Sequence, residues 1–226
     1  MLPFDGSTWL AILGQFNTAI WPLHGIGVLF ALVAVVLAFA GWHGANRVTG
    51  LLLGVLWIWT GVVFFGGSLA PFHFAAEWLA GVFVAQGLLL MFALTLMGRA
   101  RFSWPGGLAG GVAVVLIAYA LAGYPALAWV LAGTPWTQLQ VVGVAPGPTV
   151  LLTLGLLLLA RPQPPLVLAI IPLLWALVTG YMARGLDLPL EYLPAVLGVA
   201  SFAVLVALRF RCRRRRPFSN NDFTSR

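Results

Sequence analysis

The sequence predicts an all-α integral membrane protein, a polytopic bundle of about seven transmembrane helices. Of its 226 residues, 62% are hydrophobic and 8% are charged, and the mean hydropathy is +1.02. An ordinary soluble domain is about half apolar and a quarter charged. Because a helix needs about 20 residues to cross the hydrocarbon layer, seven helices with short links use nearly the whole chain.

Long apolar runs separated by Gly, Pro and Arg define the expected spans. They cover residues 19–41, 47–65, 76–97, 106–122, 149–160, 166–183 and 192–208. The fourth is expected to continue past Pro125 as a kinked end, and the fifth is short for a crossing. Ahead of the first span we expect a short interfacial segment, capped by Ser7 or Thr8, whose apolar face carries Trp9 and Phe16.

Arginines sit in alternate loops, after the first, third, fifth and seventh expected spans. These loops carry Arg47, Arg99, Arg101 and Arg161, and a cluster follows at Arg209, Arg211, Arg213, Arg214, Arg215 and Arg216. The opposite loops hold only Arg184, alongside Glu77, Asp187 and Glu191. The positive-inside rule places the first set of loops in the cytoplasm and the N-terminus outside. Residues 1–208 are then one transmembrane domain and residues 209–226 an Arg-rich cytoplasmic tail that contacts the membrane surface.

The same pattern predicts a multi-pass protein of the bacterial cytoplasmic, or inner, membrane, with the lipid bilayer as its first partner. A net charge of +7 would suggest nucleic acid in a soluble protein, but here the basic cluster directly follows a span, so no nucleic-acid partner is expected. The chain has no Lys for a Schiff base and one cysteine, Cys212. It also lacks the common catalytic motifs, so we expect no enzyme.

Polar groups within or beside apolar spans are the candidate binding residues, because they are costly in hydrocarbon. The set is Asn17, Trp21, His24, Glu77 and Gln86. They either line one pocket that opens outward or make separate hydrogen bonds between helices. His24 is also a candidate ligand for a porphyrin metal, although the sequence identifies no cofactor.

Two glycine-containing segments are the remaining candidates. Gly147 and Thr149 belong to a Pro-Gly-Pro-Thr turn, which predicts a stiff helix start or a half-helix that directs its positive end into a cavity. The fourth span opens with overlapping GxxxG motifs that favour close helix packing, within the bundle or between subunits. The glycines of these motifs are Gly106, Gly107, Gly110 and Gly111.

Several motifs together resemble a known family. They are the segment 16–22 (FNTAIWP), the segment 57–63 (WIWTGVV), Tyr124-Pro125, the segment 143–149 (GVAPGPT) and the segment 171–175 (IPLLW). The chain is similar over residues 4–205 to an uncharacterised bacterial family of small multi-spanning membrane proteins, a domain of unknown function sometimes labelled a transporter permease. It departs from that family at Gly147, where the family has Cys, and at His24, where the family has Gln. The resemblance implies a topology and no activity.

Two functions fit these observations. The first is a non-catalytic accessory or scaffold subunit of a larger membrane assembly, which packs against other membrane helices through its glycine-rich face. The alternative is a permease-like protein that binds or transports a small solute in an outward-facing polar pocket. Almost no charge lies within the spans, which argues against coupling of transport to protons or cations.

Overall fold

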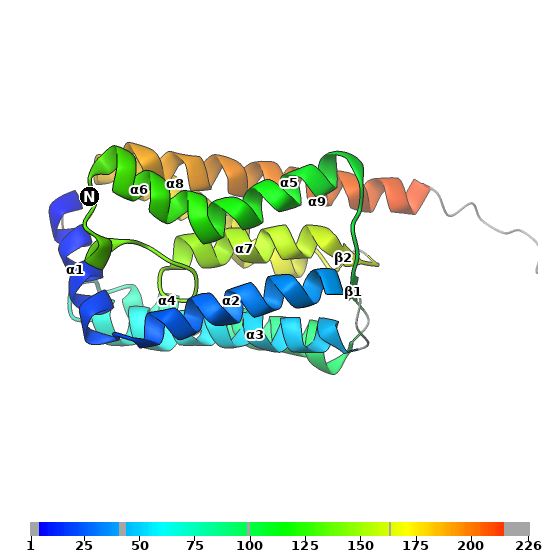
Figure 1. The fold of residues 1–226 in the computed structure, drawn as a ribbon, viewed down its shortest axis with the longest axis horizontal. Helices are drawn as coiled ribbons and strands as arrows, with labels where there is room; N and C mark the ends of the chain where they lie inside the picture. The colour runs from blue at the N-terminus through cyan, green and yellow to red at the C-terminus, as the bar shows by residue number, and fades with distance from the viewer. Residues whose placement is uncertain (1–4, 41–43, 99, 163, 215–226) are drawn as a thin grey trace, which may run out of the picture.

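The computed structural model describes residues 5–214 apart from 41–43, 99 and 163. Long helical segments lie side by side along the longest axis, α1 (Gly6–Ala19) crosses one end, and two short strands lie near the other (Figure 1). Within the described residues, six helices are long and apolar enough to span a membrane, and Pro146–Leu159 is a shorter apolar helix. The predicted all-α helical bundle is confirmed.

The elements follow each other closely along the chain. After α1 they are α2 (Leu23–Ala40), α3 (Ala45–Trp59), η1 (Thr60–Leu69), α4 (Ala76–Leu90), η2 (Met91–Leu96), β1 (Arg101–Phe102), α5 (Gly107–Ala118), η3 (Tyr119–Gly123), α6 (Tyr124–Ala132), η4 (Trp136–Gln138), α7 (Pro146–Leu159), β2 (Ala160–Arg161), α8 (Val167–Gly185), η5 (Pro189–Glu191) and α9 (Tyr192–Arg214). The π-helical segments η1, η2 and η3 continue α3, α4 and α5. As predicted, the α5 span passes Pro125, because η3 and α6 continue it.

The first helix differs from its prediction in two respects. Its N-cap is Asp5, whose side chain accepts a hydrogen bond from the backbone N–H of Thr8 at 2.8 Å, so the predicted Ser7 or Thr8 cap is wrong. That N–H is the largest cause holding the pKa of Asp5 below its ordinary value. Trp9 and Phe16 are buried against Phe64, with ring centroids 5.9 and 5.2 Å away, so α1 packs on the bundle through the face assigned to the membrane interface.

Helix α7 lies at the centre of the bundle (Figure 1). Each of its residues from Pro146 to Leu159 is buried, and the helix contacts α5, α8 and α9 as well as α2 and α3. Neighbouring helices therefore cover it on all sides, which explains why a segment too short to be an obvious span is stable inside the bundle. Trp57 on α3 joins it by donating from Nε1 to Thr153 Oγ1 at 2.8 Å.

Arginines from distant segments gather at the end opposite α1. Arg101 pairs with Arg161 in the short antiparallel β1–β2 ladder, and Arg209 donates to the carbonyl of Pro164 at 2.7 Å. This agrees with the predicted alternation of Arg-containing loops. Helix α9 continues to Arg214, past the predicted end of the span. Arg99, Arg215, Arg216 and the rest of the predicted tail lie outside the described residues.

Close helix packing through glycine occurs at a different place from the predicted one. A Cβ added at Gly106, Gly107 or Gly111 meets no described atom within 4 Å, and one at Gly110 meets only the side chain of Trp104. The prediction that this motif packs helices within the bundle is therefore wrong, because α5 contacts α7 through another face, which includes Ala113. The alternative, a contact between subunits, stays a prediction.

Candidate functional site

The start of α7 lies inside the bundle rather than at its surface. The chain reaches it through residues 141–145, whose members Val144 and Ala145 have no exposed surface. Gly143 adopts a φ of 77°, and its N–H donates to Thr149 Oγ1 at 2.9 Å, while that hydroxyl donates to the carbonyl of Ala145. Irregular backbone at membrane depth is stable only where protein groups satisfy its hydrogen bonds, and Thr149 does this here. The predicted helix start at the Pro-Gly-Pro turn is confirmed.

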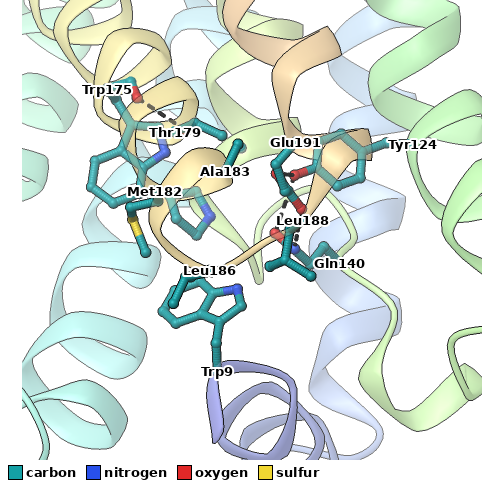
Figure 2. A pocket seen from close by; sticks show the side chains of 12 residues that line it. Trp9, Tyr124, Gln140, Trp175, Thr179, Met182, Ala183, Leu186, Leu188 and Glu191 are labelled. Atoms are coloured by element: carbon teal, nitrogen blue, oxygen red, sulfur yellow. Dashed lines mark hydrogen bonds between the residues drawn. The ribbon is translucent and has the colours of Figure 1, made fainter. Parts of the chain in front are cut away.

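Three polar side chains from separate segments meet beside this helix start (Figure 2). Glu191, at the end of η5, accepts a hydrogen bond from the hydroxyl of Tyr124 and another from Gln140 Nε2 at 2.8 Å. Tyr124 and Gln140 are 5% and 8% exposed. Glu191 itself is half-buried, and each oxygen of its carboxyl has a donor, as a carboxyl withdrawn from water normally requires.

A small cavity lies next to this cluster. It has a volume of about 20 Å³, and its lining includes Glu191, Gln140, Gly147, Trp175 and Trp9. Figure 2 shows Trp9 reaching in from α1 and Trp175 lying on α8. A volume of this size holds one water-sized group.

The indole N–H of Trp175 is the unusual group of this cavity. Trp175 is 6% exposed, yet its Nε1 has no hydrogen-bond partner among the described residues. A buried donor without an acceptor costs about 1–3 kcal/mol, so a native structure normally supplies one, from the protein or from a bound molecule. Gln140 Oε1 has only a long contact, 3.4 Å from the Tyr124 hydroxyl, and so has capacity to accept.

The arrangement suits hydrogen bonding better than metal binding. The part of the chain that the structure describes holds no group of three His, Cys, Asp or Glu side chains that could hold a metal ion. What the cavity offers is one free donor, Trp175 Nε1, and one acceptor with spare capacity, Gln140 Oε1. The positive end of α7 lies beside them at Gly147.

The structure brings together three of the predicted binding residues at another place. Asn17, Trp21 and His24 line a larger cavity formed where α1 meets α2, which residues around η4 complete. Trp21 packs on His24 with ring centroids 4.6 Å apart. The prediction of porphyrin-metal ligation by His24 stays untested.

The other two members of that set lie elsewhere, so a single pocket shared by all five residues is wrong. Glu77 is exposed at the start of α4. Gln86 is fully buried further along the same helix, where its Nε2 donates to the carbonyl of Leu168 at 2.8 Å and so ties α4 to α8. Of the predicted turn residues, Gly147 lines the small cavity, whereas Thr149 holds the turn itself.

Sequence reasoning missed the polar cluster. Tyr124 entered only through the resemblance, while Gln140 and Glu191 lie between expected spans and were not among the candidate residues. One signal was available: Gln140 and Glu191 are isolated polar residues next to apolar runs. The hydrogen bonds join residues 51 and 67 positions apart, a pairing with no local pattern.

The fold and these sites define a multi-pass helical membrane protein with buried polar groups near one end of the bundle. Residues 7–216 match the family described as "Family of unknown function (DUF6064)". The match covers most of the chain, so the protein belongs to DUF6064, and the predicted membership of a domain of unknown function is confirmed. No curated protein and no solved structure matches the chain.

Proposed function

We propose that this protein is a non-catalytic membrane protein that binds a small uncharged polar molecule at the start of α7. The observation that carries the proposal is the buried Trp175 N–H, which has no partner among the described residues although Trp175 lines a cavity with Gln140 and Glu191. This favours the solute-binding alternative of the sequence analysis over the accessory-subunit reading.

The chemistry of the cavity selects the ligand class. An anion would lie beside the Glu191 carboxyl, and a cation would face the Trp175 N–H and the positive end of α7. A hydroxyl or amide group avoids both conflicts, because it accepts from Trp175 and donates to Gln140 Oε1. Since the cavity volume is about 20 Å³, any ligand larger than water requires side chains of the lining to move.

Indole ¹⁵N NMR of the purified full-length protein in detergent tests the proposal directly. The chain has ten Trp, and the Trp175→Phe variant identifies the Trp175 signal by its loss. We expect glycerol, urea or acetamide to shift that signal in a saturable manner, because a new hydrogen bond deshields the N–H. Propionate and methylammonium are matched charged probes and should leave it unchanged.

Two variants sharpen this test. Gln140→Leu removes the acceptor, and we expect it to weaken binding of the active probe roughly tenfold, which corresponds to one hydrogen bond of about 1.4 kcal/mol. Trp78→Phe, an exposed Trp on α4, is the control and should not change binding. A Trp175 signal that ignores every uncharged probe, or shifts equally in Gln140→Leu, would contradict the proposal.

A role as an accessory or scaffold subunit is the second candidate, and the open face of α5 favours it. No described atom lies within 4 Å of a Cβ added at Gly106, Gly107 or Gly111, which leaves room for a membrane helix of another subunit. Gly111→Leu should then dissociate a complex that gentle purification retains. Recovery of the same particle mass for both forms would exclude this role for the face.

We also propose that the protein resides in a bacterial cytoplasmic membrane with its α1 end outside. The support is the set of arginines at the opposite end, including Arg47, Arg101 and Arg161. In a Cys212→Ser background, an impermeant thiol reagent applied to intact cells should label Phe74→Cys and not Ser103→Cys, both of which replace exposed residues. Labelling of Ser103→Cys from outside would reverse the orientation.

A further inference from the structure

A second and larger cavity lies between the end of α1, the start of α2 and the segment around η4. Its volume is about 490 Å³, and its lining includes Asn17, Trp21, His24 and Trp136. This volume is within the range of ordinary ligand pockets, about 300–1,000 Å³. The small cavity beside Glu191 shares no lining residue with this one, so the two are separate sites.

Two residues that line this cavity each carry a buried polar atom with no partner among the described residues. Asn17 is 8% exposed, and its Nδ2 donates to the carbonyl of Leu139 at 2.9 Å, which leaves Oδ1 free as an acceptor. Neither Asn17 Oδ1 nor His24 Nδ1 has a hydrogen-bond partner among the described residues. Two such residues in the lining of one cavity indicate a polar group that the cavity is built to receive.

The rest of the lining consists of two Trp rings, Leu139, Val141 and the threonines Thr18 and Thr137, and the Trp rings are its exposed apolar part. Trp21 and Trp136 are 63% and 68% exposed, and their rings meet edge to face with centroids 6.4 Å apart. Helix α2 buries few residues of its hydrophobic surface, Ala31, Ala34 and Ala38. Tryptophan side chains favour the region between hydrocarbon and headgroups, so the cavity opens where a lipid-like molecule carries its polar end.

We infer that this cavity binds a hydroxyl-headed amphiphile taken from the bilayer, with the hydroxyl between Asn17 and His24 and the apolar part against the two Trp rings. A hydroxyl donates to Asn17 Oδ1. Its oxygen then accepts from His24 when Nδ1 carries the proton, and a second hydroxyl donates to Nδ1 when it does not. An ester or hydrocarbon without a hydroxyl cannot donate to Asn17, so it leaves that acceptor unpaired.

Native mass spectrometry of the delipidated full-length protein tests this inference with two matched probes. Monoolein carries free hydroxyls, and methyl oleate has the same acyl chain without them. We expect one monoolein to bind per chain, roughly tenfold more tightly than methyl oleate, which corresponds to about 1.4 kcal/mol for the hydroxyl contacts. Equal binding of the two probes, or binding of neither, would overturn the inference.

The His24→Phe variant separates a hydroxyl site from general lipid adhesion. Phenylalanine keeps a ring beside Trp21 and removes Nδ1, so the preference for monoolein should fall several-fold while thermal stability changes little. His73→Phe is the matched control, because His73 does not line this cavity, and it should bind as the unchanged protein does. An unchanged preference in His24→Phe would contradict the assignment. Because the Trp175 signal reports on the other cavity, failure of either proposal leaves the other standing.

Discussion

Two groups of glycines in this protein look alike in sequence and differ completely in structure. On α3 and α4, Gly54 and Gly87 face each other so closely that a Cβ added to either would lie 2.8 or 2.6 Å from the carbonyl oxygen of the other. At the start of α5, a Cβ added at Gly106, Gly107 or Gly111 has no described atom within 4 Å. The α3 and α5 glycines have the same spacing in sequence: Gly50 and Gly54 form a GxxxG motif, as Gly107 and Gly111 do, and this motif favours close packing. The spacing therefore permits a close contact, and the neighbouring helix decides whether one forms.

The largest effect should come from filling the α3–α4 contact. We expect Gly87→Ala to destabilise the protein by about 1–3 kcal/mol, because the new Cβ meets the backbone of α3, which cannot rotate away as a side chain can. Thermal unfolding in detergent, followed by circular dichroism, measures this. An unchanged midpoint would show that the two helices are further apart than in the structure.

The contrast between the two glycine groups also shows what sequence reasoning could reach. The spans were predictable because hydrocarbon imposes length and apolarity on each segment separately, and even the short α7 followed from the alternation of arginines. Contacts between the spans were not predictable, because hydropathy does not show which face of a helix packs against which neighbouring helix. Gly54 was as visible in the sequence as Gly111, and only the structure distinguishes them.

The candidate sites show the same division. Asn17, Trp21 and His24 are close in the chain, so their proximity was predictable from local structure. Gln86 was grouped with them by depth alone, yet it lies against α8. The Tyr124–Gln140–Glu191 cluster depends on how α6, the buried segment before α7 and η5 converge, which no spacing within the sequence encodes.

A smaller effect is expected next to Gly87, where the defect is polar rather than steric. Gln86→Leu removes the hydrogen bond to the carbonyl of Leu168, and we expect it to lower the free energy of unfolding by about 1 kcal/mol. The loss is limited because the substitution also removes Gln86 Oε1, a buried acceptor that has no partner among the described residues. Gln15→Leu, at an exposed position on α1, is the control and should change stability by less. If Gln86→Leu lowers the free energy of unfolding as much as Gly87→Ala does, then the hydrogen bond of Gln86 contributes as much to the packing of α4 as the close glycine contact.

The smallest effect, of opposite sign, should follow from Gly111→Ala on the open face of α5. Alanine has a higher helix propensity than glycine by about 1 kcal/mol, and the added Cβ meets no described atom within 4 Å, so we expect a stabilisation of roughly 0.5–1 kcal/mol. The same detergent unfolding measurement applies, with Gly87→Ala as the matched substitution. If Gly111→Ala also destabilises, and does so only in preparations that retain a larger assembly, then this face is occupied by another subunit. The two glycine groups would then both be contacts, one within the chain and one between chains.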